Sequence, residues 1–202
     1  MGVPVLILGQ SGSGKTYSLR TIPNDEYGLI ECEKTMLPFR SGKNFARTKN
    51  FDELRGIIKQ YAERYPTVVV DDFGYCITDL FIHHIGDRDQ FAIYKQIAYE
   101  TYKTIEFIND LPGDVVVVIT MHMDSDSLGN IMPKVMGKMV NEKIDLLGMV
   151  NVCLLCEVAD GEHVFITDGK PPAKSCGMFD QPAIPNDLKL VTDTVRAFVG
   201  AK

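Results

Sequence analysis

The chain of 202 residues contains no apolar run long enough to cross a membrane. A membrane-spanning helix needs about 18 or more consecutive apolar residues, and no segment reaches that length. The first residues, Met1-Gly2-Val3-Pro4, carry no basic side chain ahead of the first apolar stretch, which is unlike a secretory signal. We therefore expect a cytoplasmic protein with no membrane partner.

Cysteine is scarce and odd in number, with Cys32, Cys76, Cys153, Cys156 and Cys176. These residues stand apart in apolar contexts, which indicates reduced, buried thiols rather than a disulfide framework. Cys153 and Cys156 have the spacing of a metal-binding pair, but no second pair or histidine cluster accompanies them. A zinc or redox role is therefore the less favoured interpretation.

An excess of basic residues is also missing, because 21 Lys and Arg face 27 Asp and Glu, for a net charge of −6. Contact with nucleic acid would have to come from local patches. Two segments without acidic residues qualify, 34–51 and 127–141. Their basic residues are Lys34, Arg40, Lys43, Arg47 and Lys49 in the first and Lys134 and Lys138 in the second. Phe39 and Phe45 either stack on bases there or belong to the core.

The composition is that of an ordinary globular protein, with 45% hydrophobic and 24% charged residues. A chain of this length buries roughly 70% of its unfolded surface, so the core needs no metal or disulfide. No repeat, low-complexity tract or linker divides the sequence. We expect one domain over residues 1–202.

Apolar runs of strand length alternate with longer stretches of helical period, which is typical of a parallel sheet with crossover helices. Strands are expected at residues 3–8, 28–32, 67–70 and 114–120, and helices at 15–21, 51–64, 77–85, 91–109, 138–147 and 192–199. Residues 150–158 and 163–167 form an expected antiparallel hairpin. Residues 125–137 are polar and predict an irregular loop. The fold class is therefore α/β, with a central, mainly parallel sheet and a C-terminal hairpin.

One segment matches a phosphate-binding loop at every position, with the pattern GxxxxGK followed by Thr, between an expected strand and an expected helix. Glycines let successive backbone N–H groups face phosphates, the helix start adds its dipole, and Lys15 reaches the β and γ phosphates. The Thr16 hydroxyl is a ligand for Mg²⁺. We expect Lys15 to be exposed in this loop. The predicted site for ATP and Mg²⁺ comprises Gly9, Gln10, Ser11, Gly12, Ser13, Gly14, Lys15, Thr16 and Tyr17.

Two acids follow the third expected strand. Asp71 stands where this strand ends, so its carboxylate emerges beside the phosphates and holds the magnesium shell together with Thr16. Asp72 is either a water-activating acid or the N-cap of the helix that begins near Phe73. We favour the cap.

Two more acids, Glu31 and Glu33, end the second expected strand. One residue separates them, so only one of the two carboxylates can face the nucleotide. The alternative is a pair of acids at the surface edge of the sheet.

The order of these features resembles RecA-like ATPases. A phosphate loop comes first, then a strand ending in Glu33, a strand ending in Asp71, and a strand ending in polar residues before a loop. The resemblance covers most of the chain and implies that Glu33 is the catalytic acid. It also implies a γ-phosphate sensor, for which Thr120, Met121 and His122 compete. Residues 124–138 take the place of a DNA-binding loop.

Residues 34–40, 137–144, 173–179 and 184–188 resemble phage-encoded nucleotide-binding proteins that are associated with single-strand annealing recombination. This resemblance implies single-stranded DNA, further copies of the chain, and single-strand-binding and recombination proteins of phage or host as partners. RecA's polymerisation segment and C-terminal domain have no counterpart, so filament formation does not carry over. Lys170 and Lys174 stand where RecA-like oligomers present basic residues to a neighbour's γ-phosphate. The alternative is two solvated loop lysines.

We therefore expect a Mg²⁺-dependent ATPase that binds single-stranded DNA, with Lys15, Glu33, Asp71 and Lys174 in catalytic roles. Two rival functions share the phosphate loop. A small-molecule phosphotransferase usually has an arginine-rich lid, whereas the seven arginines of this chain form no clustered pair. A nucleotide-gated binding module that does not hydrolyse ATP keeps Lys15 and Asp71 but needs no base.

Overall fold

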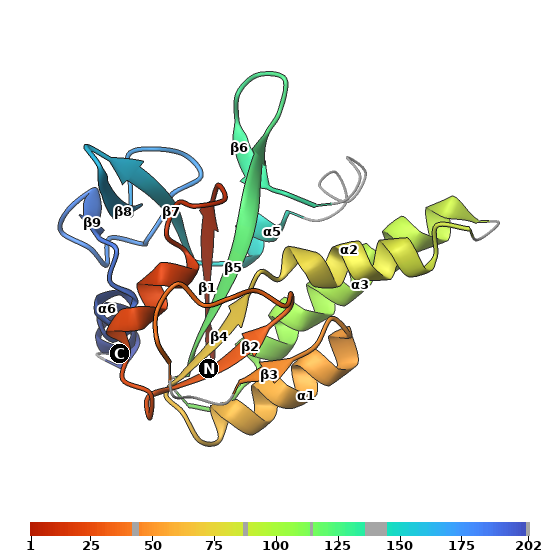
Figure 1. Cartoon of the computed structure of the whole chain (residues 1–202), viewed down its shortest axis with the longest axis horizontal. Coiled ribbons are helices and arrows are strands. Elements are labelled where there is room, and N and C mark those ends of the chain that lie inside the picture. The colour runs from red at the N-terminus through yellow and green to blue at the C-terminus, as the bar shows by residue number, and fades with distance from the viewer. Residues whose placement is uncertain (42–44, 87–88, 114, 136–144, 201–202) are drawn as a thin grey trace.

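The computed structural model describes residues 1–41, 45–86, 89–113, 115–135 and 145–200 (Figure 1). The strands in this part are β1 (Val3–Gly9), β2 (Tyr27–Glu31), β3 (Ala46–Arg47), β4 (Thr67–Asp71), β5 (Val116–Ser125), β6 (Ile131–Pro133), β7 (Val152–Ala159), β8 (Glu162–Ile166) and β9 (Ala183–Pro185). The helices are a short 3₁₀ helix η1 (Thr16–Thr21), α1 (Phe51–Ala62), α2 (Gly74–His83), α3 (Gln90–Asn109), α5 (Leu146–Met149) and α6 (Leu188–Gly200).

The described strands form one mainly parallel sheet in the order β3-β2-β4-β5-β1-β7-β8-β9, with β6 paired to β5. The pairs from β3 to β7 are parallel, whereas β7–β8, β8–β9 and β5–β6 are antiparallel. β5 lies between β1 and β4. The strand that precedes the phosphate loop, β1, is therefore separated by one strand from β4, which ends in Asp71. The carboxyl ends of these three strands meet at one edge of the sheet.

Helices cover both faces of the sheet, which is why most residues of its central strands are apolar and buried (Figure 1). On one face, Leu54 and Ile58 of α1 join the same core cluster as Ile97 of α3 and Val70 of β4. On the other face, Leu19 of η1 and Val191 and Val195 of α6 pack with Ile7 of β1 and Val118 of β5. The sheet edge that carries the site is therefore supported by a hydrophobic core on each face of the sheet.

The expected α/β class, the mainly parallel sheet and the C-terminal hairpin are confirmed. The hairpin turn contains Asp160 and Gly161, both with positive φ, as a tight two-residue turn requires. The short strands β3 and β9 were not expected, because their few residues carry no clear alternation.

Two sequence expectations need correction, and a third is tested only in part. Residues 125–135 are not an irregular loop, since β5 runs on to Ser125 and pairs with β6 in a hairpin that projects from the sheet (Figure 1). The turn is held by Asp126, which accepts hydrogen bonds from the backbone amides of Leu128 and Asn130. In the expected helix at 138–147, residues 138–144 lie outside the described part, and the described helix there is only α5.

The second correction concerns the expected helix at 15–21, which is a 3₁₀ helix over Thr16–Thr21. The Ser18 hydroxyl donates to the Lys15 carbonyl at 2.6 Å, and the Thr21 hydroxyl donates to the Ser18 carbonyl at 3.0 Å. These bonds to carbonyls three residues back compete with regular α-helical bonding. A six-residue 3₁₀ helix has little dipole, so the loop amides, not a helix start, must attract phosphates.

No helix in the described ranges is both long and apolar enough to span a bilayer.

The buried face of α1 provides a test of this packing. Leu54 is fully buried, and α1 begins properly because the Asn50 side chain accepts a bond from the Glu53 amide at 3.0 Å. Leu54→Ala should lower the free energy of unfolding by about 2–5 kcal/mol through lost burial and a cavity. Urea unfolding measures the change. Gln60→Ala, on the exposed face of the same helix, should leave the midpoint nearly unchanged, and equal effects of both substitutions would contradict this packing.

Candidate nucleotide site

The loop between β1 and η1 has the conformation that a phosphate cradle needs. Gly12 and Gly14 have φ of 79° and 104°, values that residues with a side chain rarely adopt. The backbone N–H groups of Gly12, Gly14 and Lys15 donate to no acceptor in the described part of the chain. Clustered free amides of this kind form an anion-binding concavity. The residue types and their place after β1 therefore agree with the expected phosphate loop.

Lys15 is buried rather than exposed, which corrects the expectation from the sequence. Its ammonium donates to the carbonyls of Gly9 at 2.9 Å and Gln10 at 3.0 Å. Burial lowers the pKa of Lys15, while the nearby charges of Asp72 and Asp71 raise it. The side chain thus lies folded against the loop, and its ammonium must exchange these carbonyls for phosphate oxygens when a nucleotide binds.

Asp71 is held beneath the loop by two hydroxyl groups. Thr16 donates to one carboxylate oxygen at 2.9 Å, and Thr120 at the end of the buried part of β5 donates to the other at 2.6 Å. Burial is the main cause of a raised pKa of Asp71, and the two hydroxyls act against it. The expected pairing of Thr16 with Asp71 is therefore present, and it joins the loop to β4 and β5.

Asp72 does not cap α2, so the interpretation favoured from the sequence is wrong. The N-cap residue of α2 is Phe73, and no side chain bonds to the free amides of that helix start. Asp72 has φ of 59°, a left-handed conformation that Asp tolerates better than most residues and that turns its side chain away from the helix. Burial is the main cause of its raised pKa, and the charge of Glu33 adds to the effect.

Asp72 instead lines a cavity of about 510 Å³ in front of the phosphate loop. Two histidines mark different parts of its wall. His122 lies 3.6 Å from the Asp72 carboxylate and packs edge-on against Tyr75. His163 packs against Tyr17, with ring centroids 5.8 Å apart. The remaining lining residues are Ser11, Gly12, Gly14, Lys15, Thr16, Thr35, Met36 and Pro38.

Among the three candidates for a sensor, strand alternation separates Met121 from the other two. Met121 is fully buried in the core on the α1 face. Thr120 bonds Asp71, and its oxygen also accepts from the Asp72 amide at 2.8 Å. His122 is the member of the trio that lines the cavity. Burial, followed by the charges of Lys15 and Lys134, lowers the pKa of His122, so its neutral form is favoured.

Glu31 and Glu33 are each paired with a basic residue from the segment that follows them. The buried Glu31 carboxylate accepts from Arg47 at 2.6 Å, and burial raises its pKa. The Glu33 carboxylate accepts from Lys49 at 2.6 Å, and this bond lowers its pKa. Glu33 does not line the cavity in this structure, although its charge acts on Asp72, which does.

Three side chains from the C-terminal third hold the outer side of the phosphate loop, and sequence analysis did not assign them to the site. The Ser13 carbonyl accepts from the Cys156 thiol at 3.1 Å and from His163 Nδ1 at 2.8 Å. The buried Asn186 donates to the Gly14 carbonyl at 3.2 Å. Since these carbonyls are bound from outside, the neighbouring amides stay turned toward the cavity. The stretch 184–188, noted above for its resemblance, contains Asn186, but its partner is 172 residues away.

Lys174 and Lys170 lie away from the cavity lining. The Lys174 ammonium donates to the Leu147 carbonyl at 2.5 Å, and Lys170 pairs with Glu157 at 2.6 Å. A role toward a neighbouring subunit stays a prediction. Cys153 and Cys156 belong to core clusters on opposite faces of the sheet, so they cannot share a metal ion. Burial raises the pKa of Cys153 to about 12 and that of Cys156 to about 11, so both remain thiols.

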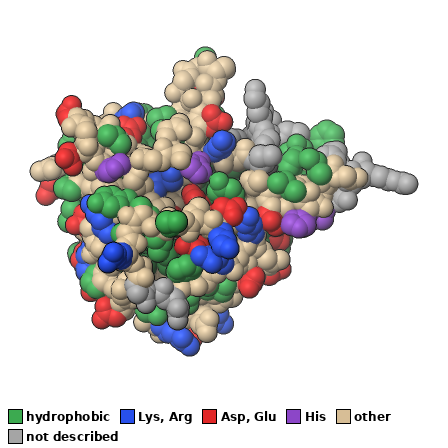
Figure 2. Space-filling model, viewed as in Figure 1, with side chains coloured by type: hydrophobic (Ala, Val, Ile, Leu, Met, Phe, Trp, Pro, Cys, Tyr) green, Lys and Arg blue, Asp and Glu red, His purple; other side chains and the backbone are tan. Residues whose placement is uncertain are grey.

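The two basic segments differ from a continuous basic surface. On the face drawn in Figure 2, Lys and Arg side chains alternate with Asp and Glu. In the first segment Arg47 and Lys49 are paired, and Phe39 and Phe45 pack against the core on the α6 face. In the second, Lys134 is exposed, whereas Lys138 lies outside the described residues, as does Lys43 of the first.

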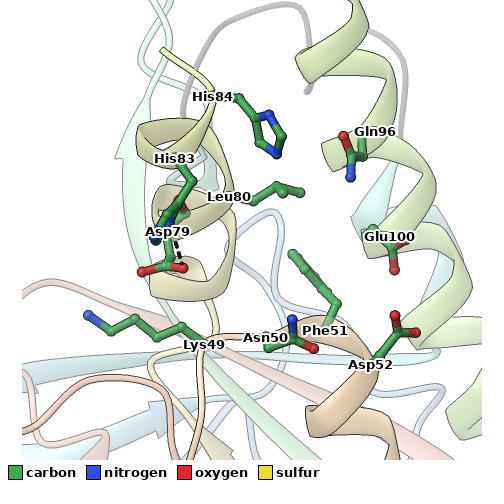
Figure 3. A pocket seen from close by; sticks show the side chains of 10 residues that line it. All are labelled: Lys49, Asn50, Phe51, Asp52, Asp79, Leu80, His83, His84, Gln96 and Glu100. Carbon is green, nitrogen blue, oxygen red and sulfur yellow. Dashed lines mark hydrogen bonds and ion pairs between the residues drawn. The ribbon is translucent and has the colours of Figure 1, made fainter. Parts of the chain in front are cut away.

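A second pocket of about 320 Å³ lies between the start of α1 and the helices α2 and α3 (Figure 3). Its acids are already partnered: Asp52 and Glu100 contact Arg55, and Asp79 contacts His83. Over the described ranges, no group of three or more His, Cys, Asp or Glu could hold a metal ion. This pocket therefore offers no comparable chemistry.

Comparison with known proteins gives one family. A family model described as an AAA domain matches residues 1–171, which include the loop, Asp71, Asp72 and His163. No curated protein matches the chain.

Lys15→Ala removes the one ammonium directed at this cradle. Because hydrogen bonds to charged groups contribute roughly 1.5–3 kcal/mol, nucleotide affinity should fall by at least about tenfold. Titration calorimetry with a non-hydrolysable ATP analogue measures it, and far-UV circular dichroism checks that the buried substitution leaves the fold intact. Lys59→Ala, on the exposed face of α1, is the control. A folded Lys15 variant with unchanged affinity would refute the phosphate loop.

Proposed function

The chain belongs to the AAA domain family, and from that premise we propose that it is a Mg²⁺-dependent ATPase that binds single-stranded DNA in phage recombination or annealing. The observation that carries the ATPase part is the Asp71 carboxylate, held between Thr16 and Thr120 beneath a loop with free amides. A buried acid, a hydroxyl and an anion cradle at one sheet edge are the parts that phosphoryl transfer requires.

The donor set fits Mg²⁺, which prefers oxygen ligands from carboxylates, hydroxyls and phosphates. Thr16 and Asp71 would hold the ion, in part through water, once the hydrogen bond between them is exchanged. When bound, the ion neutralises charge on the phosphate oxygens. The free amides of the loop and the Lys15 ammonium would orient the phosphate chain.

The attacking water needs an acceptor for its proton, and we assign that role to Glu33. Its bond from Lys49 keeps the carboxylate ionised, since the pKa of Glu33 is lowered, and its charge reaches Asp72. Thr35 and Met36, two and three residues after Glu33, line the cavity. Asp72 is the competing acid because it lines the cavity itself. Burial raises the pKa of Asp72, which makes its carboxylate a stronger proton acceptor than an exposed one.

Conservative substitutions separate these two acids. Glu33→Gln keeps shape but cannot accept a proton, so it should bind ATP normally and lose turnover by ~10² or more. Asp72→Asn retains the side chain's size and its tolerance of positive φ, and should lose much less. Phosphate release and ATP affinity are measured for both. If Asp72→Asn is the inactive variant and Glu33→Gln turns over normally, the base is Asp72.

The DNA part of the proposal rests on the strand that leaves the site. β5 continues past His122 into the projecting hairpin. After the hairpin, the backbone N–H of Lys134 donates to the His122 carbonyl at 2.8 Å. A terminal phosphate near His122 can therefore change the conformation of the hairpin segment that carries the exposed Lys134. We further propose that copies of the chain assemble, because Lys15 is the one Lys or Arg among the residues lining the cavity. Lys174 is our candidate for a cation supplied by a neighbour.

Phosphate release with and without single-stranded DNA tests this function against its rivals. We expect hydrolysis that DNA stimulates and that Lys15→Ala abolishes. Stimulation by a nucleoside or sugar instead would indicate a phosphotransferase. Nucleotide binding without turnover under either condition would indicate a gated binding module. The same assay with double-stranded DNA is the matched control for strand preference.

A further inference from the structure

His163 is held in one tautomer by the phosphate loop. Its Nδ1 lies 2.8 Å from the Ser13 carbonyl oxygen, which can only accept a hydrogen bond. The proton of the neutral imidazole must therefore sit on Nδ1. Nε2 is then left with a lone pair, and it has no hydrogen-bond partner among the residues described. The ring lines the cavity, so this acceptor belongs to the wall of the nucleotide site.

His163 lies against the phosphate loop and beside Tyr17, the residue that follows the loop motif. Lys15 marks the β and γ phosphates, and Asp72 and His122 mark the region beyond them. His163 instead contacts Tyr17, which follows the phosphate loop on the other side of Thr16. A triphosphate placed with its terminal phosphate toward the acids directs its base toward Tyr17 and His163.

This end of the cavity is rigid, as a selective contact requires. The Arg20 guanidinium lies 3.8 Å from the centre of the Tyr17 ring. The same guanidinium donates to the Asn186 side-chain oxygen at 3.0 Å and to its backbone carbonyl at 3.1 Å. The Asn186 amide in turn donates to the His163 carbonyl at 3.2 Å. The buried Asn186 thus fixes the Tyr17 ring, through Arg20, and the His163 imidazole relative to the phosphate loop.

We propose that His163 selects adenine over guanine by accepting a hydrogen bond at Nε2 from the exocyclic amino group of the base, which stacks near Tyr17. Adenine carries a donor at its position 6, whereas guanine carries an acceptor there. Two acceptors facing each other leave both unpaired, so a guanine nucleotide loses this bond and its own solvation. The inference rests on the proposed nucleotide binding and adds the residue that selects the base.

The first test uses the unaltered protein and three non-hydrolysable triphosphates, titrated by calorimetry. These carry adenine, guanine, or purine without a group at position 6. Since an unsatisfied buried polar group costs about 1–3 kcal/mol, the adenine nucleotide should bind about tenfold or more tightly than the guanine nucleotide. The unsubstituted purine should fall between them. Equal affinities for all three would overturn the proposal while leaving nucleotide binding intact, and binding of none would overturn the proposed function itself.

The second test separates base selection from support of the loop. His163→Asn keeps an N–H near the Nδ1 position, able to bond the Ser13 carbonyl, but has no atom where Nε2 lies. The adenine-to-guanine affinity ratio should fall to within about threefold of unity, mainly through weaker adenine binding. His83→Asn, at an exposed position on α2, should keep the original ratio. An unchanged ratio in a folded His163→Asn protein would overturn the role of His163.

Discussion

The Asp71 carboxylate is almost completely buried, and a buried charge is stable only where hydrogen bonds compensate for lost water. Here two threonine hydroxyls supply that compensation, one from the phosphate loop and one from β5. This requirement explains the order of the central strands. β5 must lie between β1 and β4 for Thr120 to reach Asp71, and the loop must close over β4 for Thr16 to do so. The arrangement of the sheet edge follows from satisfying this one acid.

The other acids near this edge of the sheet differ from Asp71 in the groups that contact their carboxylates. Glu31 and Glu33 are matched by Arg47 and Lys49, which lie on a short returning segment next to β2. Asp72 has no such pairing with Lys or Arg at contact distance in the described part of the chain, and it alone lines the open cavity. Charge within the segment 34–51 is thus largely a counterpart to β2 rather than a separate surface. Among the described residues elsewhere in this segment, Lys34 and Arg40 are exposed.

Sequence reasoning found the elements whose signals are local. The loop motif is contiguous, Asp71 ends a run of valines, and the turn residues at 159–162 mark the hairpin, so each could be predicted from neighbouring residues. The features that sequence analysis missed have one cause, because they depend on contacts between distant segments. They are the burial of Lys15, the left-handed conformation of Asp72, and the hydrogen bonds from His163 and Asn186 to the phosphate loop. Likewise, no pattern in residues 125–135 distinguishes an irregular loop from a hairpin stabilised by Asp126.

The contacts of Cys156, His163 and Asn186 with the phosphate loop also affect when, during synthesis, the nucleotide site can form. The phosphate loop is synthesised before the residues that bind its carbonyls, Cys156, His163 and Asn186, and before β5 and β7, which flank β1. Contacts so distant along the chain form slowly, because loop closure must precede them. A nascent chain therefore carries an unsupported phosphate loop until residue 186 has been made. Nucleotide capture then depends on residues 152–186, which lie far from the loop in the sequence.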